Sequence, residues 1–146
     1  MRIYLDNCCL QRPLDDQTQP RIKVETEAVL AILASVQAGD VRLLSSEVLE
    51  LEISRIPDEQ RRSEAIAVLA LARERLTISD ESQAHAEALE ARGIGALDAL
   101  HLAVASSANA DYFATCDDRL LKKAQQLQGL ACKIVSALGL VSEVTK

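Results

Sequence analysis

The sequence predicts an α/β protein built on a largely parallel sheet. Short apolar runs typical of strands alternate with longer segments of helical periodicity, and this alternation favours parallel strands joined by helices. The run after Gly95 is apolar on nearly every side of a helical wheel, which indicates a buried helix. The 146 residues contain no repeat, low-complexity tract or linker, so we expect a single domain, 1–146.

The elements are predicted in order from apolar runs, helix caps and helix breakers. Gly39 ends the first long helix, and Ser45 or Ser46 caps the next helix, which Pro57 brings to an end. A loop is expected between the prolines at 13 and 20. The predicted strands are 2–5, 41–44, 112–115 and 133–135. The predicted helices are 22–38, 46–55, 59–75, 82–92, the buried helix after Gly95, and 119–128.

Composition excludes several classes of protein. The net charge of -6 predicts no broad electrostatic attraction to nucleic acid, so any such contact must rely on a local patch or on metal ions. The four cysteines lack C-x-x-C spacing, which argues against a zinc ribbon or a thioredoxin-type pair and favours reduced thiols. No apolar run has the length of a signal peptide or a membrane span, so we expect a cytoplasmic protein.

Carboxylates follow two of the predicted strands. Asp6 comes directly after the first strand, and Asp117 and Asp118 come after the third. Ligands of open α/β sheets bind outside the carboxyl ends of the strands, so these acids stand where a site is expected.

Two further acids occupy helix positions where the pattern requires an apolar residue. Asp98 lies inside the buried helix, and Glu52 falls on the apolar face of the helix at 46–55. Two carboxylates about 4 Å apart repel by roughly 4 kcal/mol, so a cluster of such acids requires cations or bound protons. Ligation by oxygen alone favours Mg²⁺ or Mn²⁺, and such a site can orient a phosphodiester and activate water.

Four short motifs resemble the PIN-domain ribonucleases, the family that includes the VapC-like toxins of bacterial toxin-antitoxin pairs. They occur in the order that the family has and span most of the chain. The motifs are Tyr4-Leu5-Asp6-Asn7, Ser46 followed six residues on by Glu52, Leu97-Asp98-Ala99-Leu100-His101-Leu102-Ala103, and Thr115-Cys116-Asp117-Asp118-Arg119-Leu120-Leu121.

The resemblance implies a three-layer α/β/α sandwich, Mg²⁺- or Mn²⁺-dependent endoribonuclease activity on RNA, and a homodimer. In a toxin of this type an antitoxin protein is the expected partner. By motif position, Asp6, Glu52, Asp98 and Asp117 take the catalytic and metal-binding roles. Asp118 is an alternative fourth metal ligand, because the end of the strand can turn either acid toward the site.

Each acid also has a purely structural interpretation. His101 is interpreted as a packed or hydrogen-bonded helix residue, since metal-dependent hydrolysis does not require it as a base. The structural alternatives are a turn at Asp6, a helix cap at Asp117 or Asp118, a place in the first helical turn for Asp98, and an ion pair with Arg55 for Glu52.

Two competing functions are weighed against the same residues. A phosphatase of the haloacid dehalogenase type needs a second Asp two residues after the first, and position 8 is Cys. The alternative that stays open is a non-catalytic PIN-like module that binds RNA or a protein. Candidate phosphate contacts, which are also typical of solvated helix faces, are Arg61, Arg62, Arg119, Lys122 and Lys123.

Overall fold

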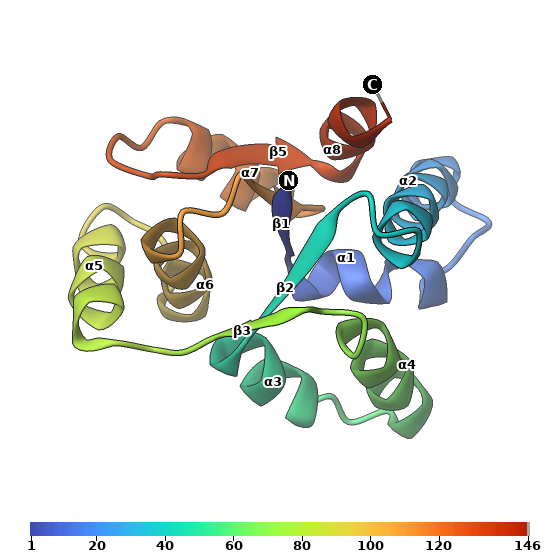
Figure 1. The fold of residues 1–146 in the computed structure, drawn as a ribbon, viewed down its shortest axis with the longest axis horizontal. Helices are drawn as coiled ribbons and strands as arrows, with labels where there is room; N and C mark the ends of the chain where they lie inside the picture. The colour runs from blue at the N-terminus through green and yellow to red at the C-terminus, as the bar shows by residue number, and fades with distance from the viewer. Residues whose placement is uncertain (146) are drawn as a thin grey trace.

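A computed structural model describes residues 1–145, and its centre is a five-stranded sheet (Figure 1). The strand order is β3-β2-β1-β4-β5, and every neighbouring pair is parallel. The last residue of the predicted domain, Lys146, lies outside the described residues. The strands are β1 (Arg2–Leu5), β2 (Arg42–Ser46), β3 (Glu74–Leu76), β4 (Tyr112–Thr115) and β5 (Lys133–Ser136).

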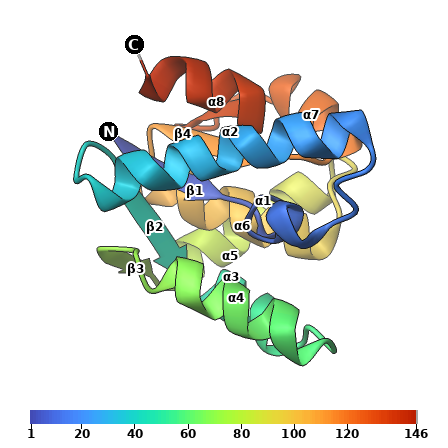
Figure 2. The same ribbon diagram turned by 90° about the vertical axis from the view of Figure 1, so that its right-hand side faces the viewer.

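Helices cover both faces of this sheet. In Figure 1, α5 and α6 lie on one side of the strands, and α2 and α8 lie on the other. Figure 2 shows α2 crossing in front of the strands with α6 behind them, which confirms the three-layer α/β/α arrangement. The helices are α1 (Asn7–Gln11), a 3-10 turn (Arg12–Leu14), α2 (Pro20–Gln37), α3 (Glu47–Ser54), α4 (Glu59–Leu69), α5 (Asp80–Glu90), α6 (Ala96–Ser107), α7 (Asp118–Gln125) and α8 (Ala137–Val144).

The predicted strands at 2–5 and 112–115 coincide with β1 and β4. The helix predicted over 59–75 is wrong over residues 70–75, because α4 ends at Leu69 and β3 follows at Glu74. β3 is a three-residue edge strand with the sequence Glu-Arg-Leu, and it exists because it pairs with β2. The short helices α1 and α8 lay outside every predicted element. α1 has five residues, which is too short to show a helical period.

The interior is aliphatic, with one pair of stacked rings at its centre. Tyr4 on β1 and Phe113 on β4 are fully buried, and their ring centroids are 5.3 Å apart. Ser46 caps α3 as predicted, because its side chain accepts a hydrogen bond from the Leu49 N–H. Within residues 1–145, no helix combines the length and the apolar character that a membrane span requires.

The strand order creates a topological switch point beside β1. The chain proceeds from β1 to β2 and β3 on one side of the sheet and returns to β4 on the other side of β1. The carboxyl ends of β1 and β4 are therefore adjacent, with Leu5 in register with Ala114. Crevices at such points bind ligands in parallel α/β sheets, and Asp6 follows β1 at this place.

Candidate functional site

Asp6 lies at the switch point, where it is only 6% exposed. It caps α1, because one carboxylate oxygen accepts a hydrogen bond of 2.8 Å from the Asn7 N–H. The other oxygen accepts a bond of 2.9 Å from the Thr115 hydroxyl at the end of β4. Burial raises the pKa of Asp6 to about 7, so the carboxyl group resists ionisation unless a cation is near. The turn role and a place in the site are therefore compatible.

Glu52 projects from α3 toward α6. Its Oε1 accepts a hydrogen bond of 2.9 Å from His101 Nε2, and its side chain is 27% exposed. Within residues 1–145, Glu52 forms no ion pair with Arg55, so the pairing considered from the sequence does not occur. Asp6, Glu52 and His101 offer ligand atoms that all lie within 4.8 Å of one another. These three side chains form a possible metal-binding cluster.

A chain of hydrogen bonds behind Glu52 fixes its position. Tyr4 Oη lies 2.7 Å from Ser46 Oγ and 2.6 Å from His101 Nδ1. Burial raises the pKa of Tyr4 well above its usual value, so the phenol keeps its proton. If Tyr4 donates to Nδ1, a neutral imidazole carries its own proton on Nε2 and donates it to Glu52. His101 is thus a buried, hydrogen-bonded helix residue, as predicted.

Asp98 occupies the first turn of α6, after the N-cap Gly95. The favourable interaction with the helix dipole considered from the sequence is therefore available to it. Burial, and next the charge of Asp6, raise the pKa of Asp98 to about 6. Glu52 and Asp117 raise this pKa further, which shows that the four carboxylates share one electrostatic environment. His101, three residues later, lies on the same face of α6.

Asp117 and Asp118 point in different directions. Asp117 caps α7 by accepting bonds from the N–H groups of Arg119 and Leu120, at 2.9 and 3.2 Å, and it lines a small hollow with Asp98. Asp118 is exposed, and each of its oxygens accepts a bond of 2.7 Å from Arg21. The structure therefore places Asp117 beside Asp98, whereas Asp118 is bound by Arg21.

The four site carboxylates lack a cationic partner among side chains. In the part of the chain that the structure describes, no Lys or Arg forms an ion pair with Asp6, Glu52, Asp98 or Asp117. The side-chain oxygen of Asn7 is buried nearby without a hydrogen-bond partner. Four carboxylates, of which Asp6 and Asp98 have raised pKa values, together with an unsatisfied amide oxygen fit a hard divalent cation.

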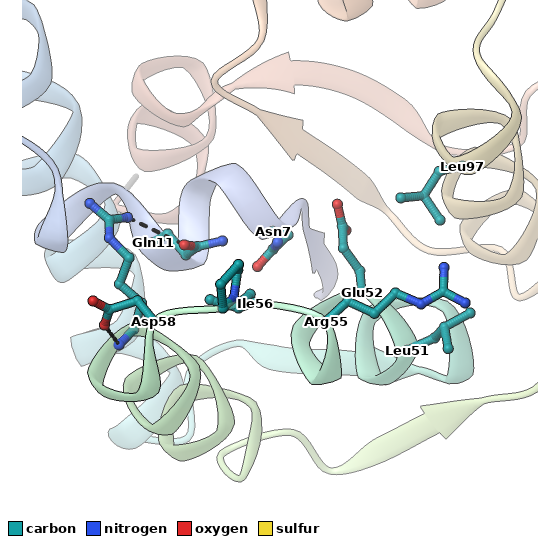
Figure 3. A pocket seen from close by; sticks show the side chains of 10 residues that line it. Asn7, Gln11, Leu51, Glu52, Arg55, Ile56, Asp58 and Leu97 are labelled. Atoms are coloured by element: carbon teal, nitrogen blue, oxygen red, sulfur yellow. Dashed lines mark hydrogen bonds between the residues drawn. The ribbon is translucent and has the colours of Figure 1, made fainter.

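Two hollows adjoin the acids. One of about 520 Å³ lies between α1 and α3, where Figure 3 shows the Glu52 carboxylate beside Asn7, with Leu97 across from it. The other is bordered by Asp98, Asp117, Arg119 and Lys123.

Three residues predicted as phosphate contacts also bind protein oxygens. Arg61 lies 2.9 Å from Asp15 and donates to the carbonyl oxygen of Leu14 at 2.8 Å. Arg62 donates to the carbonyl oxygen of Ile56 at 2.8 Å, and Lys123 donates to that of Gly93 at 3.0 Å. Arg119 and Lys123 line the hollow of Asp98 and Asp117, and Arg61 lines the hollow of Glu52.

Sequence reasoning missed the supporting role of Tyr4 and the contact between His101 and Glu52. A signal was present for His101, because a polar residue three positions after Asp98 must lie on the same helix face. No comparable signal existed for Tyr4, since β1 and α6 are about a hundred residues apart in the chain.

Fold and site together define a class: a parallel α/β protein whose acidic side chains gather at the switch point of the sheet. The sequence matches the PIN domain over residues 3–126, and the chain therefore belongs to the PIN domain family. No curated protein matches the sequence.

Two solved structures share this fold. One is VapBC2 from Rickettsia felis bound to a DNA fragment from their promoter, with a TM-score of 0.58, 17% identity, and coverage of 93% of this chain and 98% of that chain. Another is VapBC-5 from Mycobacterium tuberculosis, a member of the VapBC family of toxin-antitoxin systems, with a TM-score of 0.51, 16% identity, and coverage of 92% and 98%. At these identities the likeness establishes a common fold.

Proposed function

We propose that this chain is a Mg²⁺- or Mn²⁺-dependent endoribonuclease that hydrolyses RNA phosphodiester bonds, and that it is the toxin of a toxin-antitoxin pair. The observation that carries the proposal is the convergence of four carboxylates without a Lys or Arg partner among the described residues. Membership of the PIN domain family supports it.

The residues that would hold the ion are Asp6, Glu52 and Asp98, with Asp117 as a fourth ligand. When bound, such an ion orients a phosphodiester, lowers the pKa of an attacking water and stabilises the leaving oxygen. Asp6 is held by Asn7 and Thr115, and Glu52 is held by His101, so both carboxylates are oriented in advance.

The surroundings of the acids suit a nucleic-acid strand. Arg119 and Lys123 border Asp98 and Asp117 and supply positive charge for a phosphate. The hollow beside Glu52 has apolar walls that include Leu51 and is large enough for a nucleobase. With a net charge of -6, the affinity for RNA must come from these local contacts and from the metal ion.

Partners follow from the proposed role. The solved structures of the same fold are VapBC proteins of toxin-antitoxin systems, which supports an antitoxin protein as the partner of this chain. We also propose a homodimer, for which the exposed side chains of Val24 on α2 and Leu138 on α8 are candidate contacts. Light scattering of the purified chain measures this oligomeric state.

The test is cleavage of a mixed set of single-stranded and structured RNAs by the wild type and by Asp98→Asn, with Mg²⁺, with Mn²⁺ and with chelator. We expect cleavage that requires metal and is lost in the variant. Asp118→Asn is the matched control, because it removes a neighbouring charge that Arg21 neutralises outside the site. Absence of cleavage by a folded wild type under all conditions would favour the non-catalytic binding module.

A further inference from the structure

Three cysteine side chains gather beside Asp6, with Cys8 Sγ 3.4 Å from Asp6 Oδ2. Cys8 and Cys9 belong to α1, and Cys116 follows β4. All three are free thiols, Cys9 and Cys116 are buried, and Cys8 is half-buried. They lie close together because Cys8 and Cys9 follow β1, Cys116 follows β4, and these two strands are neighbours in the sheet.

The distances between the sulfurs match those of a metal-thiolate site. Cys9 Sγ and Cys116 Sγ are 3.5 Å apart, and all three sulfurs lie within 4.8 Å of one another. Thiolates bind Zn²⁺ at about 2.3 Å in tetrahedral geometry, which requires sulfur-sulfur separations of about 4 Å. Side-chain rotations alone therefore suffice to place the three sulfurs around one ion.

A backbone donor and a guanidinium group reach two of these sulfurs. The backbone N–H of Cys116 donates to Cys8 Sγ at 3.2 Å. The guanidinium group of Arg12 interacts with Cys116, and it also forms ion pairs with Asp15 and Glu25, at 3.0 and 3.4 Å. Three thiolates around a divalent ion leave a net charge of about -1, and Arg12 places positive charge next to Cys116.

We propose that Cys8, Cys9 and Cys116 form a binding site for one thiophilic d¹⁰ cation of the Zn²⁺ or Cd²⁺ class. Binding converts the three thiols to thiolates, so that three S–H bonds break, three metal-sulfur bonds form and three protons leave to solvent. The sulfur site adjoins the carboxylates, since Cys8 Sγ lies 3.4 Å from Asp6 Oδ2. It differs from them in the ion that it selects, because Mg²⁺ and Mn²⁺ prefer oxygen ligands and d¹⁰ cations prefer sulfur. It does not depend on the nuclease activity.

The test is a Cd²⁺ titration of the full chain under a phosphine reductant, followed by the ultraviolet charge-transfer absorption of cadmium bound to thiolate sulfur. We expect the absorption to saturate at one ion per chain. Cys116→Ser and Cys8→Ser should each weaken binding by about tenfold or more. Cys132→Ser is the matched control, since this free thiol is buried elsewhere in the molecule and should leave the titration unchanged.

Two further measurements make the result decisive. Asp98→Asn should retain the cadmium absorption, because that carboxylate is not a ligand of the sulfur site. Circular dichroism checks that each variant folds, and Cys8→Ser, at a half-buried position, tests the site even if Cys116→Ser does not fold. The proposal is overturned by the absence of the absorption in the wild type, by its persistence in folded Cys8→Ser, or by its loss in Asp98→Asn.

Discussion

Acidic residues that are neighbours in the sequence have different surroundings in the fold: some are bound by arginine, and others lie at the candidate site without a Lys or Arg partner among the described residues. Asp118 is exposed and bound through both oxygens to Arg21, which lowers the pKa of its carboxyl group. Asp117, one residue earlier, caps α7 and borders Asp98 without an ion pair in residues 1–145. Consecutive residues of the chain thus differ in that Asp118 is neutralised by arginine and Asp117 belongs to the candidate site.

The helix α3 repeats this contrast. Glu50 is bound by Arg75 at 2.8 Å, and the guanidinium lowers the pKa of the carboxyl group. Glu52 lies two residues later, on the face that meets α6, where its partner is His101. Asp118 and Glu50 thus have arginine partners, whereas Asp6, Glu52 and Asp117 accept hydrogen bonds that orient them.

The site acids lower the stability of the folded chain when they ionise. Burial raises the pKa values of Asp6 and Asp98 to about 7 and about 6, so ionising them opposes folding in the absence of a cation. Groups with strongly perturbed pKa values in a cleft are typical of functional sites. The following experiments test whether the two groups of acids differ in function as they differ in surroundings.

The largest effect is expected for Asp98→Asn. Loss of a carboxylate ligand should lower metal-dependent RNA cleavage by on the order of 100-fold or more, because the metal ion supplies several kcal/mol of transition-state stabilisation. Single-turnover cleavage assays measure this loss. Asp118→Asn should cleave like the wild type, and an equal loss in both variants would remove the distinction between the two groups.

A smaller effect is expected when the support of Glu52 is weakened. Tyr4→Phe removes the hydroxyl that orients His101, which should lower the affinity for Mn²⁺ by about tenfold. Calorimetric titration with Mn²⁺, without RNA, measures this affinity. Tyr112→Phe, which loses a hydroxyl bonded to Glu143, is the matched control. Equal affinities in the two variants would show that Tyr4 does not position Glu52.

Stability should fall as pH rises in the metal-free wild type. Asp6 has a pKa of about 7 in the folded chain against 3.8 in the unfolded chain. Between these values the folded chain binds more protons, so the free energy of unfolding decreases with increasing pH. Urea unfolding with chelator at several pH values measures this slope.

The same measurement on Asp6→Asn isolates this residue. We expect a flatter pH profile and, near pH 8, a gain on the order of 2 kcal/mol, since one pKa unit corresponds to about 1.4 kcal/mol and Asn keeps only part of the hydrogen bonds that Asp6 accepts. Mg²⁺ should stabilise the wild type more than the variant. Wild-type stability that rises with pH would contradict the assignment of Asp6.

The smallest effect is expected for Glu50→Gln. Its ion pair with Arg75 is exposed to solvent, and such pairs contribute little to stability. The thermal unfolding midpoint and RNA cleavage should both remain close to those of the wild type. Cleavage reduced as strongly as in Asp98→Asn would place Glu50 in the site and would contradict the distinction between Glu50 and Glu52.

The sequence predicted the elements that are long or strongly patterned. β1, β4 and α6 follow from apolar runs and end signals, and Ser46 follows from capping chemistry. The edge strand β3 was not predicted, because its three residues have no pattern of their own and form a strand only by pairing with β2.

The candidate site likewise has features that the sequence predicted and features that only the tertiary structure revealed. Asp6, and either Asp117 or Asp118, were predicted from strand ends. Glu52 and Asp98 were predicted from the helical period, and both signals depend on near neighbours in the chain. Three features depend on contacts between distant segments and were not predicted. They are the hydrogen bonds from Tyr4 through His101 to Glu52, the pairing of Asp118 with Arg21 that sets it apart from Asp117, and the contact between Cys9 and Cys116.

The sequence by itself determined the strongly patterned elements, such as β1, β4 and the capped start of α3, because capping, periodicity and strand ends act over a few residues. Only the tertiary structure decided which acids are neutralised by arginine and which remain without a cation. That choice depends on side chains such as Arg21, which lies 97 residues from Asp118 in the chain. Such contacts form only after the strands have assembled, and no local pattern specifies them.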